Sequence, residues 1–114
     1  MKSPTVGPKV RVVMVTQHFN ALTEAQAERL AILVEECGEV VQAACKILRH
    51  GYDSTNNGQM SETNRQQLQR ELGDLLHAVE RMARCGDVQR LAIEDRRKSK
   101  PAKIRPFLHH QEER

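Results

Sequence analysis

Two stretches of this chain place carboxylates inside strongly apolar helical patterns, and few folds accommodate that combination. The first stretch, residues 33–44, contains Glu35, Glu36 and Glu39 among Leu, Val, Cys and Ala residues. The second, residues 68–76, contains Glu71 and Asp74 among leucines. Glu36 and Glu39 are one helical turn apart, and so are Glu71 and Asp74, so each pair shares a margin of its apolar face. The pattern predicts two long helices that carry matching acid pairs.

The ends of the first long helix are marked in the sequence. Thr23 followed by Gln26 predicts a capping box that opens the helix. The apolar periodicity then continues to about His50, and Gly51 is a suitable residue to end the helix. Because aromatic residues make up only 3% of the chain and Trp is absent, the core must be built mainly from Leu, Val, Ile and Ala.

The second long helix is expected to start after a cap at Ser61 and to end near Cys85, and Asp87 is expected to cap a shorter third helix of about ten residues. Residues 10–15 form the only β-rich run, which predicts either a short strand or an extended arm. We therefore predict an all-α fold with two long antiparallel helices and shorter helices around them. Its predicted parts are an N-terminal arm over residues 1–22, a helical core over 23–95 and a basic tail over 96–114.

The apolar arcs of the two long helices are too wide for one helix pair to cover. Each arc spans roughly 180°, against the ~100° stripe of an ordinary surface helix. This predicts a homodimer or a tetramer in which long helices of two chains form a four-helix bundle. The three cysteines, Cys37, Cys45 and Cys85, lack metal-site spacing and are interpreted as small packing residues in a reducing cytosol. No apolar run approaches the roughly 20 residues of a membrane span, so a cytoplasmic protein is expected.

In an antiparallel helix pair, the two margins bring Glu36, Glu39, Glu71 and Asp74 together. Four neighbouring carboxylates repel one another, so either some hold protons or a cation neutralises them. Oxygen ligands alone favour Mg²⁺ or Mn²⁺, whereas zinc or a di-iron centre would require His or Cys. His77, three residues after Asp74, is rotated away from the acids. The alternative is that the acids are solvated or paired with Lys and Arg, as most helical Glu residues are.

The motif Glu35-Glu36-x-x-Glu39, followed by Glu71-x-x-Asp74 in the next long helix, resembles the signature of the MazG-like all-α nucleoside triphosphate pyrophosphatases. The likeness covers about residues 26–110 and is greatest to the short single-repeat members of phages and mobile bacterial elements. It implies Mg²⁺-dependent hydrolysis of a nucleoside triphosphate, expected to be a deoxynucleotide, between the α and β phosphorus atoms. The products would be a monophosphate and pyrophosphate, in a nucleotide-pool house-cleaning role.

The resemblance also implies roles for individual residues. Carried over by motif position, Glu36, Glu39, Glu71 and Asp74 would be the Mg²⁺ ligands. Glu35 would be the catalytic acid that orients the attacking water or helps to hold a second metal. Candidates for binding the substrate phosphates are Lys46 in the first helix and Lys98, Lys100, Lys103 and Arg105 in the basic tail. The alternative for the tail is a solvated or partner-binding segment.

Two other functions remain open at this point. The same fold could act as a non-catalytic module that binds or senses a nucleotide. A helical protein could also bind nucleic acid through residues 96–105, which contain six Lys and Arg residues and no acid. The complete acid set favours the enzyme over both. Only Phe19, Tyr52 and Phe107 could stack on a base, so the sequence does not indicate the preferred nucleotide.

Overall fold

The computed structural model describes residues 20–55 and 62–112, and most of these are helical. Helix α1 spans Glu24–His50, α2 spans Asn64–Arg84 and α3 spans Arg90–Ile104, followed by a 3₁₀ turn, η2, over Arg105–Phe107. These described residues contain no strand, which confirms the all-α class for them. The strand or arm predicted at residues 10–15 lies outside the described ranges.

The ends of α1 are as predicted. The Thr23 hydroxyl accepts a hydrogen bond from the Gln26 backbone N–H at 3.1 Å, and the Gln26 side chain accepts one from the Thr23 N–H at 2.9 Å. At the other end Gly51 adopts φ +86°, a conformation that few residues other than glycine adopt, and its N–H bonds to the Ile47 carbonyl at 2.7 Å. Interactions between residues close in sequence therefore determine where α1 begins and where it ends.

The predicted cap of α2 is wrong. The N-cap is Thr63, not Ser61, and it forms a second capping box with Gln66. The α1–α2 connection is closed by Asn64, whose side-chain amide donates to the Gly51 carbonyl at 3.0 Å. The box and this amide together hold the start of α2 against the end of α1.

Asp87 does not cap the third helix. The N-cap of α3 is Gln89, which makes no side-chain capping bond. The Asp87 carboxylate instead binds the Arg29 guanidinium through two bonds, of 2.5 Å from Nε and 2.9 Å from Nη2. A charge-assisted bidentate pair is stronger than a bond to a helix N–H. The Asp87 carboxylate therefore pairs with Arg29 and does not cap α3. Helix α3 is also longer than expected, because it continues through Pro101 and across the predicted boundary between core and tail.

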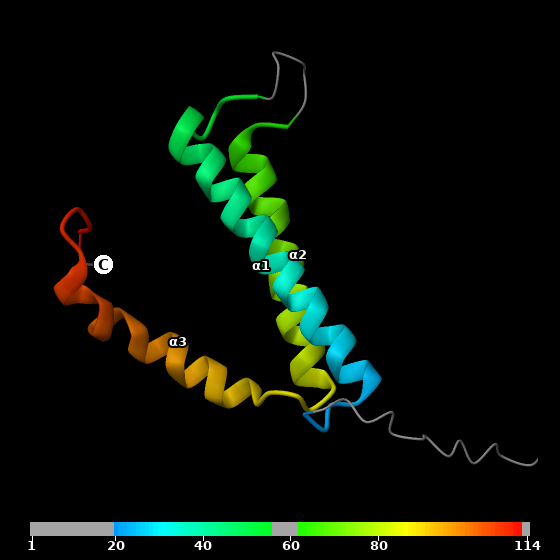
Figure 1. Cartoon of the computed structure of the whole chain (residues 1–114). Coiled ribbons are helices and arrows are strands. Elements are labelled where there is room, and N and C mark those ends of the chain that lie inside the picture. The colour runs from blue at the N-terminus through cyan, green and yellow to red at the C-terminus, as the bar shows by residue number, and fades with distance from the viewer. Residues whose placement is uncertain (1–19, 56–61, 113–114) are drawn as a thin grey trace, which may run out of the picture.

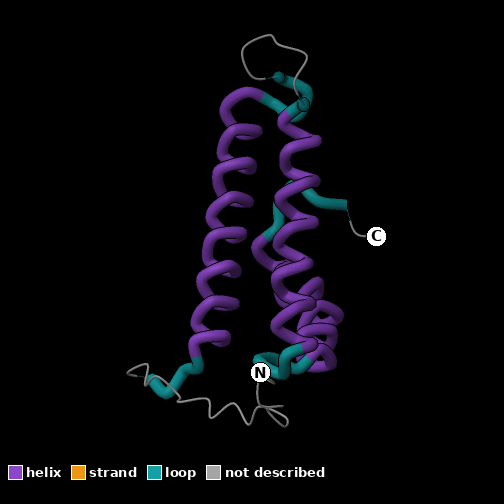
Figure 2. Tube along the Cα trace, turned by 90° about the vertical axis from the view of Figure 1, so that its right-hand side faces the viewer, coloured by secondary structure: helices purple, strands orange, loops and turns teal. Residues whose placement is uncertain are grey.

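Helices α1 and α2 form an antiparallel hairpin, whereas α3 leaves its lower end and diverges from it (Figure 1). Seen from the side, the two long helices run next to each other along their whole lengths (Figure 2). The radius of gyration is 21.2 Å, against about 13 Å for a compact domain of this length. The chain is therefore open, and the predicted four-helix bundle between chains stays a prediction.

The core of the hairpin is thin. Its buried apolar side chains are Ala43, Ala78 and Met82. Large apolar side chains on both helices remain exposed, namely Leu30, Ile32, Val34, Val41, Leu48, Leu72 and Leu76. All three cysteines are exposed as well, so their interpretation as packing residues is wrong within a single chain. Within the described residues, no helix combines the length and apolar content that crossing a membrane requires.

Candidate metal centre

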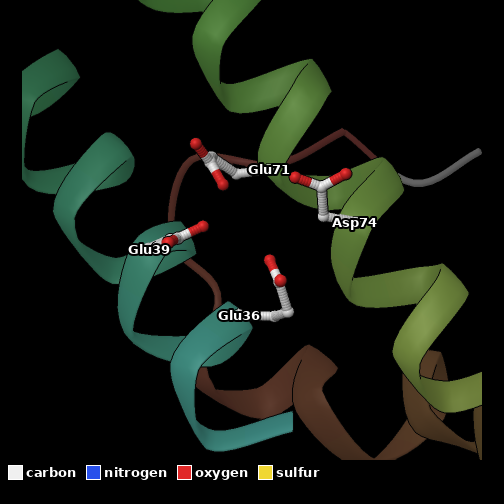
Figure 3. A group of neighbouring side chains, drawn as sticks. All are labelled: Glu36, Glu39, Glu71 and Asp74. Carbon is white, nitrogen blue, oxygen red and sulfur yellow. The ribbon is translucent and has the colours of Figure 1, made fainter. Parts of the chain in front are cut away.

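Two helices contribute one acid pair each to a single cluster. Glu36 and Glu39 lie one turn apart on α1, and Glu71 and Asp74 lie one turn apart on α2 (Figure 3). One carboxylate oxygen from each residue lies within 4.8 Å of the others. The antiparallel hairpin thus brings together, within one chain, the four acids that the sequence pattern pairs.

Two oxygens of the cluster are buried and lack a hydrogen-bond partner. They are Oε2 of Glu36 and Oε2 of Glu71. Glu71 is only 4% exposed, and its other oxygen accepts a bond from Arg70 Nη1 at 3.1 Å. A buried carboxylate oxygen without a partner is costly. Both unpartnered oxygens belong to the cluster, so one ligand placed there would satisfy both.

The cluster also alters the protonation of one of its members. Hydrogen bonding of the protonated Glu39 carboxyl to Glu71, and then the negative charge of Glu71, raise the pKa of Glu39 to about 7. Partial burial and the charges of Glu36 and Glu35 add to the shift. Near neutral pH the Glu39 carboxyl is therefore protonated in a substantial fraction of the molecules, which offsets part of the repulsion among the four acids. This is the behaviour expected of carboxylates held close together without a cation.

The donor set fits a hard divalent cation. In an octahedral Mg²⁺ site with bonds of about 2.1 Å, opposite oxygens lie about 4.2 Å apart. The 4.8 Å limit on the cluster's oxygens is close to that value, so small side-chain rotations would suffice. The alternative is that Lys and Arg side chains neutralise the four acids, and they do so only in part. Among the described residues the only ion pair to a cluster carboxylate is from Arg70 to Glu71, and Arg70 also binds Glu62 at 2.6 Å.

The other predicted site residues lie outside the cluster. Glu35 is exposed on α1, beside the acids but not among the four. Lys46 is partly buried, and its Nζ donates to Gln67 Oε1 at 3.0 Å, which directs it towards α2. Lys98, Lys100 and Lys103 are exposed on α3, which diverges from the hairpin (Figure 1). A single chain therefore does not bring these three lysines to the acids.

Arg70 and Glu62 are participants that the sequence analysis missed. Arg70 connects the buried Glu71 to Glu62, which lies just before α2. The only sequence signal is that Arg70 is adjacent to an acid of the motif, and neighbouring residues on a helix usually point in different directions. The arginine positions one oxygen of Glu71 and leaves the other directed at the cluster.

Comparison with known families agrees with this geometry. The family model described as the MazG nucleotide pyrophosphohydrolase domain matches residues 24–105. The chain belongs to the MazG family. The MazG match begins at the first residue of α1 and ends just after α3, so it includes both acid pairs and the basic helix. A search of curated proteins found no match, and neither did a search of solved structures.

Membership of the MazG family supports nucleotide pyrophosphohydrolase activity in general. Enzymes of the family generally depend on a divalent metal, and the acid cluster is compatible with one. The resemblance seen in the sequence motif is therefore confirmed at the level of the family.

Proposed function

We propose that this protein is a Mg²⁺-dependent nucleoside triphosphate pyrophosphohydrolase that converts a deoxynucleoside triphosphate into its monophosphate and pyrophosphate. The observation that carries the proposal is the cluster of Glu36, Glu39, Glu71 and Asp74, with two buried oxygens lacking a partner, inside a MazG domain. In this assignment the four acids hold the cation, for which Mn²⁺ could substitute.

Each group of this chain has a distinct part in the proposed reaction. When bound, the cation would supply positive charge to the triphosphate oxygens and act as a Lewis acid. The four carboxylates fix its position, and Arg70 keeps Glu71 in place through the bond to Oε1. Glu35, exposed beside the cluster, would accept a proton from the attacking water and orient it towards the α phosphorus.

The triphosphate also requires positive charge from the protein. Lys46 lies two turns after Glu39 on α1, and a rotation of its side chain would exchange Gln67 for a phosphate oxygen. Lys98, Lys100 and Lys103 form no ion pair among the described residues, so their charges are available for phosphate. Because α3 diverges from its own hairpin, we propose that these lysines reach the substrate only within a homodimer or tetramer.

The decisive experiment incubates the purified protein with each dNTP and NTP in the presence of Mg²⁺ and identifies the first product. Pyrophosphate and a monophosphate are expected, and orthophosphate as the first product would contradict the proposal. Glu36→Gln and Asp74→Asn should each lower kcat at least 100-fold, because each removes a ligand charge from the cluster. The matched control, Glu28→Gln, removes an exposed acid from α1 outside the cluster and should retain full activity.

One observation favours a second activity for the basic segment. Residues 96–105 are exposed on every side of α3, as a nucleic-acid-binding helix would be. Such binding would weaken steeply with salt and would be lost on neutralising Lys98, Lys100 and Lys103, but not in Glu71→Gln. Substrate binding by the same lysines predicts instead that the triple substitution raises KM for the triphosphate without creating or removing an affinity for DNA or RNA.

A further inference from the structure

The guanidinium of Arg70 binds two carboxylates, one from the acid cluster and one from outside it. Its Nη1 donates to Glu71 Oε1 at 3.1 Å. Its other edge donates to Glu62, from Nη2 to Oε1 at 2.6 Å and from Nε to Oε2 at 3.4 Å. Glu71 is one of the four acids of the candidate metal centre (Figure 3). The edge of Arg70 that holds Glu62 is therefore separated from that centre by a single side chain.

This edge of Arg70 is the part of a guanidinium that recognises phosphate. Nε and Nη2 point in parallel, and they bind two oxygens of a phosphate group as readily as two oxygens of a carboxylate. Glu62 satisfies both donors in the free chain, but the side chains of Arg70 and Glu62 are 53% and 41% exposed. Neither partner is held in place by burial. A phosphate group can therefore replace the Glu62 carboxylate without disturbing the core of the hairpin.

A second cation acts on Glu62. Hydrogen bonding to Arg70 is the main cause of its lowered pKa, and the charges of Arg70 and Lys46 lower the pKa further, against the effect of partial burial. Lys46 belongs to α1, and its Nζ donates to Gln67 Oε1 on α2 at 3.0 Å. Gln67 is one helical turn before Glu71, so Lys46 lies next to the acid cluster along the hairpin. The Glu62 carboxylate is therefore close to one cation from each long helix.

The acid cluster by itself would repel a triphosphate. Four ionised carboxylates outweigh the charge of one divalent cation, so the loaded centre stays negative. The substrate phosphates consequently need cationic side chains beside the cluster. Arg70 and Lys46 are in the same hairpin as the acids, whereas the lysines of α3 are on a helix that diverges from it (Figure 1).

We propose that Arg70, together with Lys46, binds a phosphate group of the nucleoside triphosphate, and that Glu62 occupies this phosphate site until the substrate displaces it. Arg70 keeps its bond to Glu71 and exchanges only Glu62. Glu62 thus competes with the substrate and weakens its binding. This inference rests on the proposed function, and it identifies a phosphate site that a single chain forms beside the metal centre.

Other exposed arginine–glutamate pairs do not combine these features. Arg90 binds Glu80 at the start of α3, and Arg97 binds Glu94 within α3. Neither of these arginines bonds to an acid of the cluster. Within residues 20–55 and 62–112, Arg70 is therefore the one arginine that connects an exposed, replaceable carboxylate to the candidate metal centre.

Glu62→Gln tests the proposal, because it removes the competing charge and keeps every acid of the metal centre. With Mg²⁺ in excess, calorimetry measures the binding of two probes: pyrophosphate and a non-hydrolysable α,β-imido deoxynucleoside triphosphate. Glu62→Gln should lower the Kd of both probes about twofold to fivefold, the scale of an exposed ion pair that no longer has to be broken. Glu80→Gln, the matched control, breaks the exposed pair with Arg90 and should leave both Kd values unchanged.

The same substitution in an Arg70→Gln background assigns the effect to the arginine. Arg70→Gln alone should raise both Kd values at least about tenfold, but it also removes a partner of Glu71. The decisive comparison is therefore Glu62→Gln in that background, where it should have no effect because the arginine that it releases is absent. An equal gain in both backgrounds would mean that Glu62 acts only as a distant charge, and it would overturn the assignment. An unchanged or raised Kd for Glu62→Gln alone would overturn it too, as would a wild type that binds neither probe.

Turnover separates this proposal from the proposed function. If the wild type releases no pyrophosphate from any triphosphate, but Glu62→Gln tightens binding only when Arg70 is present, the phosphate site stands and the proposed activity is wrong. If the wild type releases pyrophosphate, and Glu62→Gln neither tightens binding nor lowers KM, the activity stands and the phosphate site is wrong.

Discussion

Cation binding at the acid cluster should be coupled to the release of one proton. The raised pKa of Glu39, about 7, arises first from the hydrogen bond with Glu71 and then from the charge of Glu71. A divalent cation binds the carboxylates and not the carboxylic acid, so a proton held by Glu39 must leave when the cation binds. Lowering the pH through 7 should therefore weaken Mg²⁺ or Mn²⁺ binding, with no change in the number of ligands.

The size of the effect follows from this pKa. With a pKa of about 7, Glu39 is about 9% ionised at pH 6 and about 91% ionised at pH 8, so the apparent Kd should be about tenfold higher at pH 6. Proton release on binding should be about 0.9 per cation at pH 6 and about 0.1 at pH 8. Isothermal titration calorimetry of the metal-free protein, in buffers with different ionisation enthalpies, measures both quantities.

The stability of the metal-free protein should depend on pH with a definite sign. The pKa of Glu39 is raised on folding from its ordinary 4.5 to about 7, so between these values the folded chain binds more protons than the unfolded chain. The contribution of Glu39 to stability therefore falls as pH rises through this window. The contribution of Asp87 to stability depends on pH in the opposite direction. Its bonds to Arg29 lower its pKa, so its contribution is lost only as pH falls. Glu39→Gln, compared with the wild type by thermal unfolding, isolates the first effect.

Two results would refute the reasoning. The first is a cation affinity that is the same at pH 6 and pH 8, which would mean that Glu39 is already ionised in the metal-free cluster. The second is a Glu39→Gln variant that keeps the pH dependence of binding, which would assign the proton to another group. Saturating Mg²⁺ should also remove the loss of stability with rising pH in the wild type, since the cation then replaces the proton.

Three further substitutions have expected outcomes. Glu71→Gln should weaken Mg²⁺ binding at least tenfold in calorimetry while the metal-free protein melts no lower than the wild type, because one like charge is removed; Glu28→Gln, the control, should bind as the wild type does. Gly73→Ala should raise the free energy of unfolding in urea by about 1 kcal/mol, since a Cβ there meets nothing within 4 Å; a loss of stability would indicate a contact that the single chain does not show. Asp87→Asn should lower the melting temperature by removing the ionic partner of Arg29, and an unchanged melting temperature would show that this pair is not stabilising.

The parts of the fold that sequence could predict depend on local chemistry. The capping box of Thr23 and the glycine stop at Gly51 each involve residues within four positions, so a short window contains the whole interaction. The start of α2 was mispredicted although the signal was present. Thr63 has a glutamine three residues later, whereas Ser61 has Asn64 at that place. A capping box requires both partners, and the second partner decides between two nearby hydroxyl residues.

The acid cluster was predictable for a similar reason. Glu36 and Glu39 are three residues apart, so they lie on the same edge of the apolar face of α1. Antiparallel packing places this edge next to the edge of α2 that carries Glu71. The role of Asp87 was not predictable, because its partner Arg29 is 58 positions away and nothing in the periodicity connects them. The path of α3 was not predictable either. Its direction depends on contacts at the turn after α2, and a helical pattern does not encode these.

The hairpin carries two kinds of surface that cannot share one side: a cluster of carboxylates and a set of exposed apolar side chains. Four carboxylates need a margin open to water and ligands, because burying them completely without a cation would be too costly. The exposed apolar residues need the opposite, a surface that excludes water. On α1 these requirements meet within two residues, Glu39 and Val41, which point in nearly opposite directions. Val41 can therefore be substituted without altering the acid cluster, and Glu39 can be substituted without altering the exposed apolar side chains of α1. The apolar arc of α1 is wider than its contact with α2: one part of it faces α2, and the remainder is exposed in the single chain.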